Sequence, residues 1–105
     1  MVVVIECTDP RALLSAMRDR MTRGYEGVWW MDLDGDLVYS GPDTRLLTAA
    51  VLRPVVGPGT IRVEVVRWKA QKLTRPVVGG YVTAFVGMVV THFSTWVKRV
   101  VVEMG

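Results

Sequence analysis

A segment of 21 residues, 77–97, contains no Lys, Arg, Asp or Glu, and it constrains the fold more than any other feature. Its apolar residues recur at a period near 3.6, which predicts an α-helix, with Thr74 as the N-cap and Pro76 in the first turn. Alternation typical of a strand is poor, although the many valines leave a strand as the alternative. The expected apolar face of the helix comprises Val78, Val82, Phe85, Val89, Phe93, Trp96 and Val100.

The length of this predicted helix points to a partner. A helix over residues 74–102 would measure about 43 Å at 1.5 Å per residue, whereas a domain of this size is about 33 Å across. We therefore expect the helix to break near Gly87 or to project beyond the core and be buried elsewhere. A stripe of small residues four apart would let a second helix approach closely; it comprises Gly79, Thr83, Gly87, Thr91 and Thr95.

The same uncharged segment is long enough to cross a bilayer core of about 30 Å. Eight of its residues are Gly, Thr, Ser or His, and it contains neither Leu nor Ile. Basic residues flank both ends, so the positive-inside rule favours neither orientation. A helix packed within protein fits this composition better, and a single-helix membrane-associated protein through 77–97 ranks third among the functions considered.

The first half of the chain carries clear local signals. Residues 2–7 begin with a continuous apolar run up to Glu6, which predicts a strand that is buried on both faces and hence central in its sheet. Asp9 and Pro10 predict the start of a helix that Gly24 would close. Asp34-Gly35 predicts a hairpin with a type I′ turn between residues 28–33 and 36–40. In that register Met31 lies opposite Val38, and Trp30 opposite Tyr39.

The middle of the chain is more ambiguous. Asp43 predicts the start of a short helix that ends before Pro54, and Leu and Ala favour this helix over a strand across residues 45–56. Residues 60–69 alternate like a strand, with a bulge or the end of the strand expected at Val65-Val66. The predicted fold is a single α+β domain over residues 1–105, with a ferredoxin-like (split βαβ) sheet and a long additional C-terminal helix. Such a fold does not by itself identify a function.

Cysteine content and charge bear on location and partners. Cys7 is the only cysteine, so no intramolecular disulfide can form, and the first residues lack a basic region and a signal-type cleavage site. We therefore expect the cytoplasm or another reducing compartment. Residues 1–52 hold five Arg and eight Asp or Glu, whereas residues 53–105 hold eight Lys or Arg and two Glu. This asymmetry would steer association if the two halves are separate in space.

Candidate chemical motifs are incomplete. Asp32, Asp34 and Asp36 are spaced like calcium ligands, but Leu37 stands where an EF-hand loop needs Gly and Asp43 where it needs Glu. Cys7 and His92 would form a nucleophile pair only if a third group oriented them, and the sequence indicates none. Phosphate-binding loops, nucleophile elbows and CxxC pairs are absent from the sequence. We expect no enzymatic activity, no metal and no cofactor.

Two binding hypotheses remain. The favoured one is a non-catalytic subunit that assembles with itself or with another protein in a larger particle such as a virion. Its expected interface comprises Gly79, Thr83, Gly87, Thr91, Trp96, Val97, Val100, Val101, Trp29 and Trp30. The second is nucleic-acid binding through a basic cluster with one stacking aromatic, comprising Arg62, Arg67, Trp68, Lys69, Lys72 and Arg75. It ranks lower because the aromatic sheet motif of ferredoxin-like RNA binders is missing.

Overall fold

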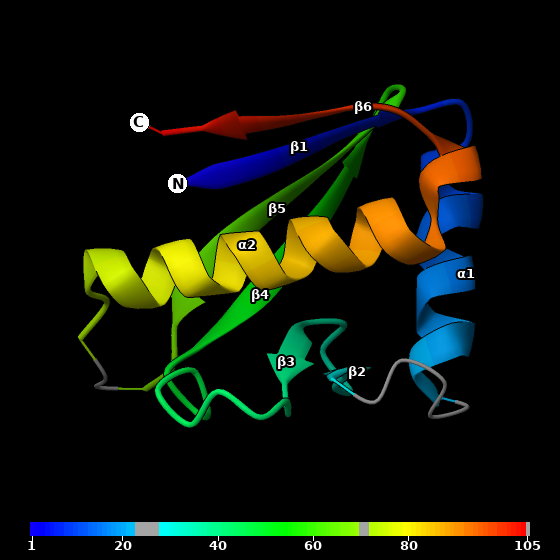
Figure 1. Cartoon of the computed structure of the whole chain (residues 1–105). Helices are drawn as coiled ribbons and strands as arrows, with labels where there is room; N and C mark the ends of the chain where they lie inside the picture. Colours follow the sequence, from blue (N-terminus) through cyan, green and yellow to red (C-terminus); the bar gives the residue numbers. More distant parts are fainter. Residues whose placement is uncertain (23–27, 70–71, 105) are drawn as a thin grey trace.

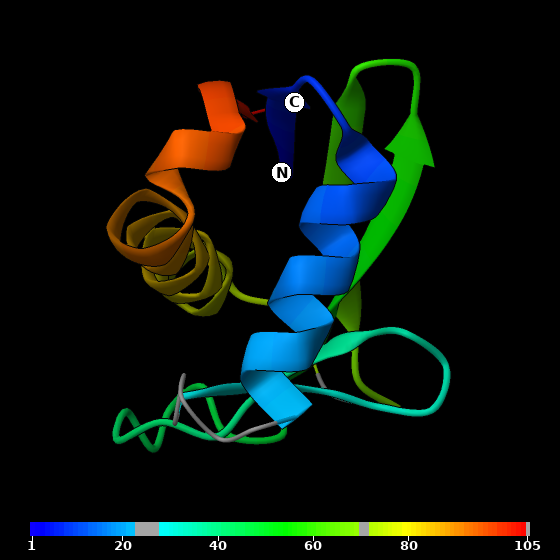
Figure 2. The same cartoon turned by 90° about the vertical axis from the view of Figure 1, so that its right-hand side faces the viewer.

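The protein is an α+β molecule with one six-stranded antiparallel sheet and two helices, both on the same side of the sheet (Figures 1 and 2). This computed structural model describes residues 1–22, 28–69 and 72–104. The elements are β1 (Val2–Cys7), α1 (Pro10–Thr22), β2 (Trp29–Met31), β3 (Leu37–Tyr39), β4 (Ala50–Gly57), β5 (Thr60–Arg67), α2 (Arg75–His92), a 3₁₀ turn (Ser94–Trp96) and β6 (Val97–Glu103).

The strand order is β2-β3-β4-β5-β1-β6, and every neighbouring pair is antiparallel. This is not the order of the ferredoxin-like sheet that we expected from the sequence. The N-terminal strand β1 lies between β5 and β6, which is the interior position that its apolar run predicts. Val3, Ile5 and Cys7 of β1 are buried on the side of the helices. Val2 and Val4 on the other face are only partly buried, so the predicted burial of both faces is wrong.

The expected helix after β1 is present, and its N-terminus has the predicted cap. The backbone N–H of Ala12 donates to the Asp9 carboxylate at 3.1 Å, which satisfies one of the amides that a first helical turn leaves unpaired. Leu13 and Met17 point into the core at helical spacing. Gly24, the expected C-cap, lies outside the described residues.

The hairpin is present, but its turn and register differ from the prediction. Trp29 lies opposite Tyr39 and Trp30 opposite Val38, one residue away from the predicted pairing. The loop spans residues 32–36, and of its residues Gly35 alone has a positive φ, +84°. The Asp32 carboxylate accepts the backbone N–H groups of Asp34 and Asp36, at 2.9 and 3.0 Å. This side-chain cap stabilises a longer loop than a two-residue type I′ turn.

Gly35 should still be sensitive to substitution, because its positive φ disfavours a β-branched side chain. Gly35→Val is expected to lower the free energy of unfolding by more than about 1 kcal/mol. Denaturant unfolding followed by circular dichroism measures this loss. A Cβ at Gly35 meets no described atom within 4 Å, so an unchanged stability would show that its backbone conformation is not strained for valine.

The middle segment forms turns over residues 44–49 and then strand β4, so the predicted short helix that starts at Asp43 and ends before Pro54 is wrong. Strand β4 contains Pro54, which has no N–H to donate. Among the described residues, Leu52 is the only β4 residue that pairs with β3, and Pro54 lies two residues beyond it. The N–H group that Pro54 lacks would face the β3 side, so its absence breaks no described hydrogen bond between the strands. The β4–β5 register runs without a shift from Gly57↔Thr60 to Ala50↔Arg67, and the bulge expected at Val65-Val66 is absent from this pairing.

The C-terminal third is a helix followed by a strand, which corrects the prediction of one long helix. Thr74 caps α2 as expected, accepting the Val77 N–H at 3.4 Å. The helix ends at His92, and its 18 residues measure about 27 Å, which fits within extents of 35 × 33 × 24 Å. Trp96 closes the 3₁₀ turn, and Val100 belongs to β6, which runs back to pair with β1.

Candidate interaction surface

Strand β6 lies at one end of the sheet, and within the described residues no strand pairs with its outer side. It is seven residues long, contains no proline, and is β-branched at Val97, Val100, Val101 and Val102. Proteins usually protect such an edge, because its unpaired N–H and C=O groups can hydrogen-bond to another chain. The opposite edge, β2, has only three residues. The longer of the two edge strands is therefore β6, whose outer side pairs with no described strand.

The two faces of β6 differ in chemistry. Val100 and Val102 lie opposite Ile5 and Val3, whose side chains are buried beneath the helices, so this face is apolar. The other face of the sheet, which the helices leave open, carries three β6 side chains: Arg99, Val101 and Glu103. An apolar row on one side and a charged row on the other thus run along the same edge.

Ion pairs connect the charged row to the neighbouring strands. The Arg62 guanidinium on β5 donates to the Glu103 carboxylate at 2.9 Å, reaching over β1. The Arg99 guanidinium donates to Glu6 on β1. These side chains are about half exposed or more, except Glu6, so solvent screens both pairs and each adds little to stability. Their effect is to hold alternating charges in place on the open face.

The small-residue stripe of α2 lies on the outer surface of the helix. A Cβ at Gly79 or Gly87 would meet no described atom within 4 Å, and Thr83 and Thr91 are exposed. By contrast, a Cβ at Gly80 would lie 2.8 Å from Leu46 Cδ2, because that glycine faces inward. Within the described structure the outer side of the stripe is therefore open, and its role as a contact for another segment stays a prediction.

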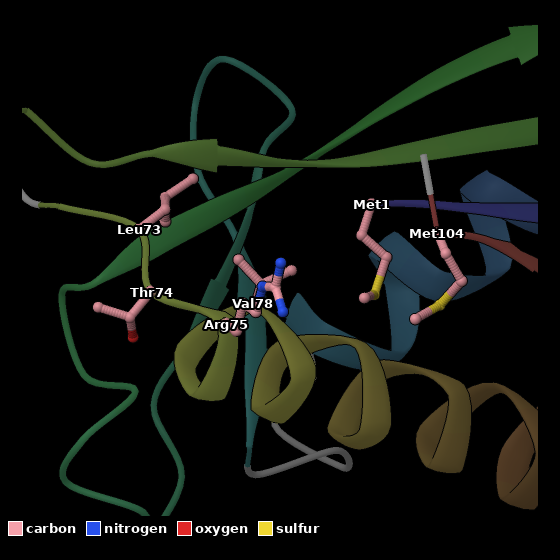
Figure 3. A pocket seen from close by; sticks show the side chains of 6 residues that line it. All are labelled: Met1, Leu73, Thr74, Arg75, Val78 and Met104. Carbon is pink, nitrogen blue, oxygen red and sulfur yellow. The ribbon is translucent and has the colours of Figure 1, made fainter.

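Two cavities lie between α2 and the sheet, one near each end of β6. The larger, about 640 Å³, lies between the first turn of α2 and the ends of β1 and β6 (Figure 3). It is lined by Met1, Leu73, Thr74, Arg75, Val78 and Met104. The smaller, about 240 Å³, is lined by Val89, Val90, Ser94, Val97, Lys98, Arg99 and Val100. Both linings are mainly apolar.

The tryptophans of the expected interface lie in different places. Trp29 is only 2% exposed and belongs to the core, so it contributes to no surface. Trp30 is 46% exposed on β2, at the opposite end of the sheet from β6. Trp96 is 41% exposed in the turn before β6, next to Val97. Of these three tryptophans, only Trp96 lies next to β6.

The basic cluster is divided in the folded chain. Arg67, Trp68 and Lys69 line a shallow cavity of about 260 Å³, with the Lys69 ammonium 5.8 Å from the Trp68 ring centroid. Three carboxylates line the same cavity, those of Asp32, Asp34 and Asp36. Arg62 lies on the open face with Glu103, Arg75 lies in the first turn of α2, and Lys72 is exposed before it. The carboxylates offset the positive charge that a phosphate backbone would need.

The Asp36 carboxylate is buried and paired. Arg53 on β4 donates to it through two nitrogens, at 3.1 and 3.0 Å. The carboxylate in turn raises the pKa of Arg53 through this hydrogen bond. A bidentate pair of this kind fixes the hairpin loop against β4. The carboxylates of Asp32 and Asp36 thus have structural contacts, and among the described residues no group of three or more potential metal ligands is present.

The two unique residues considered for catalysis have separate contacts. Burial raises the pKa of the Cys7 thiol, and the nearby Asp9 raises it further, so the thiol is less reactive than an exposed one. His92 lies at the end of α2, where its Nδ1 is 2.9 Å from an Arg20 guanidinium nitrogen on α1. Within the described chain, no helix has the length and hydropathy of a membrane span.

Comparisons of the chain with protein-family models, with curated proteins and with solved structures found no match.

The edge strand was missed by sequence reasoning, although some of its residues were singled out. The sequence pattern places Val97, Val100 and Val101 on a helix face. It therefore did not predict that they belong to the edge strand of a sheet. Val102 and Glu103 were not singled out at all. The available signal was the run of three adjacent valines at 100–102, which favours a strand over a helix.

Proposed function

We propose that this protein is a non-catalytic subunit that works by assembling with other protein chains, and first of all with its own copies. One observation supports this most: β6 is a seven-residue edge strand with no described strand on its outer side, and a mainly apolar cavity lies near each of its ends. Self-association ranks above a place in a mixed particle such as a virion. The reason is that β6 carries Arg99 and Glu103 on one face, a charge pair that a second copy can complement.

The mass in solution tests this proposal. Light scattering at micromolar to high micromolar concentration should give a mass above that of the 11.7 kDa chain. Raising the salt from 0.05 to 0.5 M should weaken the association without abolishing it, because ions screen exposed charges but leave apolar burial intact. A monomer at every concentration and at both salt levels would contradict self-association.

Nucleic-acid binding is the second proposal, carried by Trp68 and its basic neighbours Arg67 and Lys69. Its rank is lower because three aspartates share that cavity. Fluorescence anisotropy with single- and double-stranded DNA and RNA should detect no sub-micromolar binding at 0.15 M salt. Tight binding that weakens steeply with salt would reverse the ranking of the two functions.

The proposed cellular location rests only on the single cysteine of the chain. Cys7 has no second cysteine to pair with, and its thiol is buried. We place the protein in the cytoplasm or another reducing compartment on this ground.

A further inference from the structure

The direction of the backbone groups on β6 follows from a hydrogen bond in β1. The Cys7 N–H donates to the Gly59 carbonyl at 2.9 Å, so the backbone groups of Cys7 point toward β5. In an antiparallel strand, successive residues direct their N–H and C=O groups to opposite sides. Val4 and Glu6 therefore direct theirs toward β6, where they lie opposite Val101 and Arg99.

The same alternation continues across β6. Arg99, Val101 and Glu103 face β1 with their backbone groups, so Val100 and Val102 direct theirs to the open edge. These outward groups have no described strand as a partner. They are the groups through which another strand would add to the sheet.

We propose that two copies of this chain pair through antiparallel β6 strands, with the two-fold axis passing at Val101. This pairing rests on the proposed self-association and specifies its surface. Val100 then lies opposite Val102 of the second copy, and both residues have outward backbone groups, as a hydrogen-bonded pair requires. Val101 lies opposite its own copy as a non-hydrogen-bonded pair. The two sheets join into one of twelve strands, with the helices of both copies on the same side.

Charge selects this register among the two-fold alternatives. With the axis at Val101, Arg99 lies opposite Glu103 of the second copy, and this happens twice. An axis at Val100 or Val102 leaves Arg99 without an acidic neighbour across the seam. An axis at Arg99 or Glu103 places like charges opposite each other, which is unfavourable.

The existing ion pairs extend this complementarity. Within one copy Arg62 bonds to Glu103, and Arg99 bonds to Glu6. Joining Glu103 of one copy to Arg99 of the other produces an alternating row across the seam: Arg62, Glu103, then Arg99 and Glu6 of the second copy. Each carboxylate has two oxygens and each guanidinium five donors, so the added contacts do not require the existing ones to break.

The cavities also meet at the proposed seam. Met104 lines the larger cavity, and Lys98 lines the smaller one. In the register centred on Val101, Met104 comes near Lys98 of the second copy, where the β1–β6 register of each copy shifts by one residue. Figure 3 shows the Met1 and Met104 side chains on the side of α2. The apolar lining at both ends of β6 would thus be removed from water.

Disulfide cross-linking reads the register directly. Cα atoms of a non-hydrogen-bonded antiparallel pair are about 4.5 Å apart, within the disulfide range of about 4.4–6.8 Å. Val101→Cys should therefore give a covalent dimer under mild oxidation, seen on a non-reducing gel. Val4→Cys is the matched control: Val4 lies on the same face, but the two copies of Val4 are about 14 Å apart, three strand spacings. It should give no dimer.

A cysteine at Val100 distinguishes the neighbouring register. With the axis at Val101, the two Val100 Cα atoms are about 8 Å apart, which is too far for a disulfide. Efficient cross-linking through Val100→Cys and not through Val101→Cys would overturn the proposed axis. The native Cys7 is buried and present in every variant, so it does not bias the comparison.

Three further variants test the edge itself by sedimentation. Val102→Pro removes an outward N–H that β1 does not use, so the variant should be a monomer with its circular dichroism spectrum retained. Arg99→Glu places like charges across the seam twice and should weaken the dimer about tenfold. Adding Glu103→Arg to Arg99→Glu restores opposite charges across the seam and should recover association, although it removes both pairs within each copy.

The outcomes separate this proposal from the broader one. A parent protein that oligomerises while Val101→Cys fails to cross-link and Arg99→Glu keeps the parent's association constant would overturn the β6 pairing and leave self-association standing. A parent that stays monomeric overturns both. Cross-linking at Val101 together with weaker association of Arg99→Glu supports the proposed pairing.

Discussion

Trp29→Ala is expected to lower the free energy of unfolding by about 3–5 kcal/mol, the range for truncating a large buried aromatic side chain. The Trp29 indole packs edge-on against three rings, those of Tyr39, Tyr81 and Phe85, with centroid distances of 5.4, 6.0 and 6.1 Å. It joins the hairpin to α2, so its loss opens a cavity between two elements. Urea unfolding followed by circular dichroism measures the change.

The adjacent tryptophan provides a matched control. Trp30 points to the other side of β2 and is 46% exposed, so Trp30→Ala should change the free energy of unfolding by much less than Trp29→Ala. The predicted type I′ register would place Trp30 opposite Tyr39 instead. If Trp30→Ala proved the more destabilising of the two, the register of the hairpin would be shifted by one residue.

Signals contained within a few neighbouring residues predicted the structure well. The Asp9 cap, the Thr74 cap and the apolar spacing from Val82 to Phe93 depend on contacts within one or two helical turns. Such contacts form wherever the segment lies in the molecule. The helix starts and the buried face of α2 could therefore be predicted from the sequence.

The C-terminal strand depends on a distant partner, and for this reason its prediction failed. Trp96 and Val100 continue the helical spacing of α2, so the local pattern gives no reason to end the helix at His92. The structure of this segment is decided by its pairing with β1. One side of β1 pairs with β5, and β6 pairs with the other side. The prediction that residues 2–7 are interior to the sheet already implied an additional strand, and the valines at 100–102 were suited to supply it.

The candidate surface was predicted in part for the same reason. The stripe of α2 lies on one helix face, and residues such as Thr83 and Gly87 follow from helical spacing alone. The unpaired edge of β6 could not be predicted, because the sequence pattern assigns its residues to a helix. Pro54 misled the prediction in another way, because a proline argues against a strand unless the neighbouring strand has already ended. In the folded protein β3 pairs with β4 only at Leu52, and the sequence around Pro54 does not show where this pairing ends.

Tyr81→Phe should cost about 1–3 kcal/mol, because it removes a buried hydroxyl and leaves backbone groups without their partner. The Tyr81 hydroxyl accepts the Ala50 N–H at 3.1 Å and donates to the Leu46 carbonyl. It therefore holds the segment before β4 against α2. The side chain is fully buried, so water cannot replace the hydroxyl without a rearrangement. Thermal unfolding at neutral pH measures the loss.

The same variant should change the response to alkaline pH. Burial raises the pKa of Tyr81 above its ordinary value of 10.0, against an opposing effect of its backbone hydrogen bonds. The unfolded chain then ionises first, so the stabilisation is complete below pH 10 and is lost as the pH rises through the higher pKa of the folded state. Phenylalanine cannot ionise, and the stability of Tyr81→Phe should fall less steeply above pH 10. Cys7 has a raised pKa in both proteins, so its contribution cancels in the comparison. Parallel losses in the two proteins would show that Tyr81 does not cause the alkaline destabilisation.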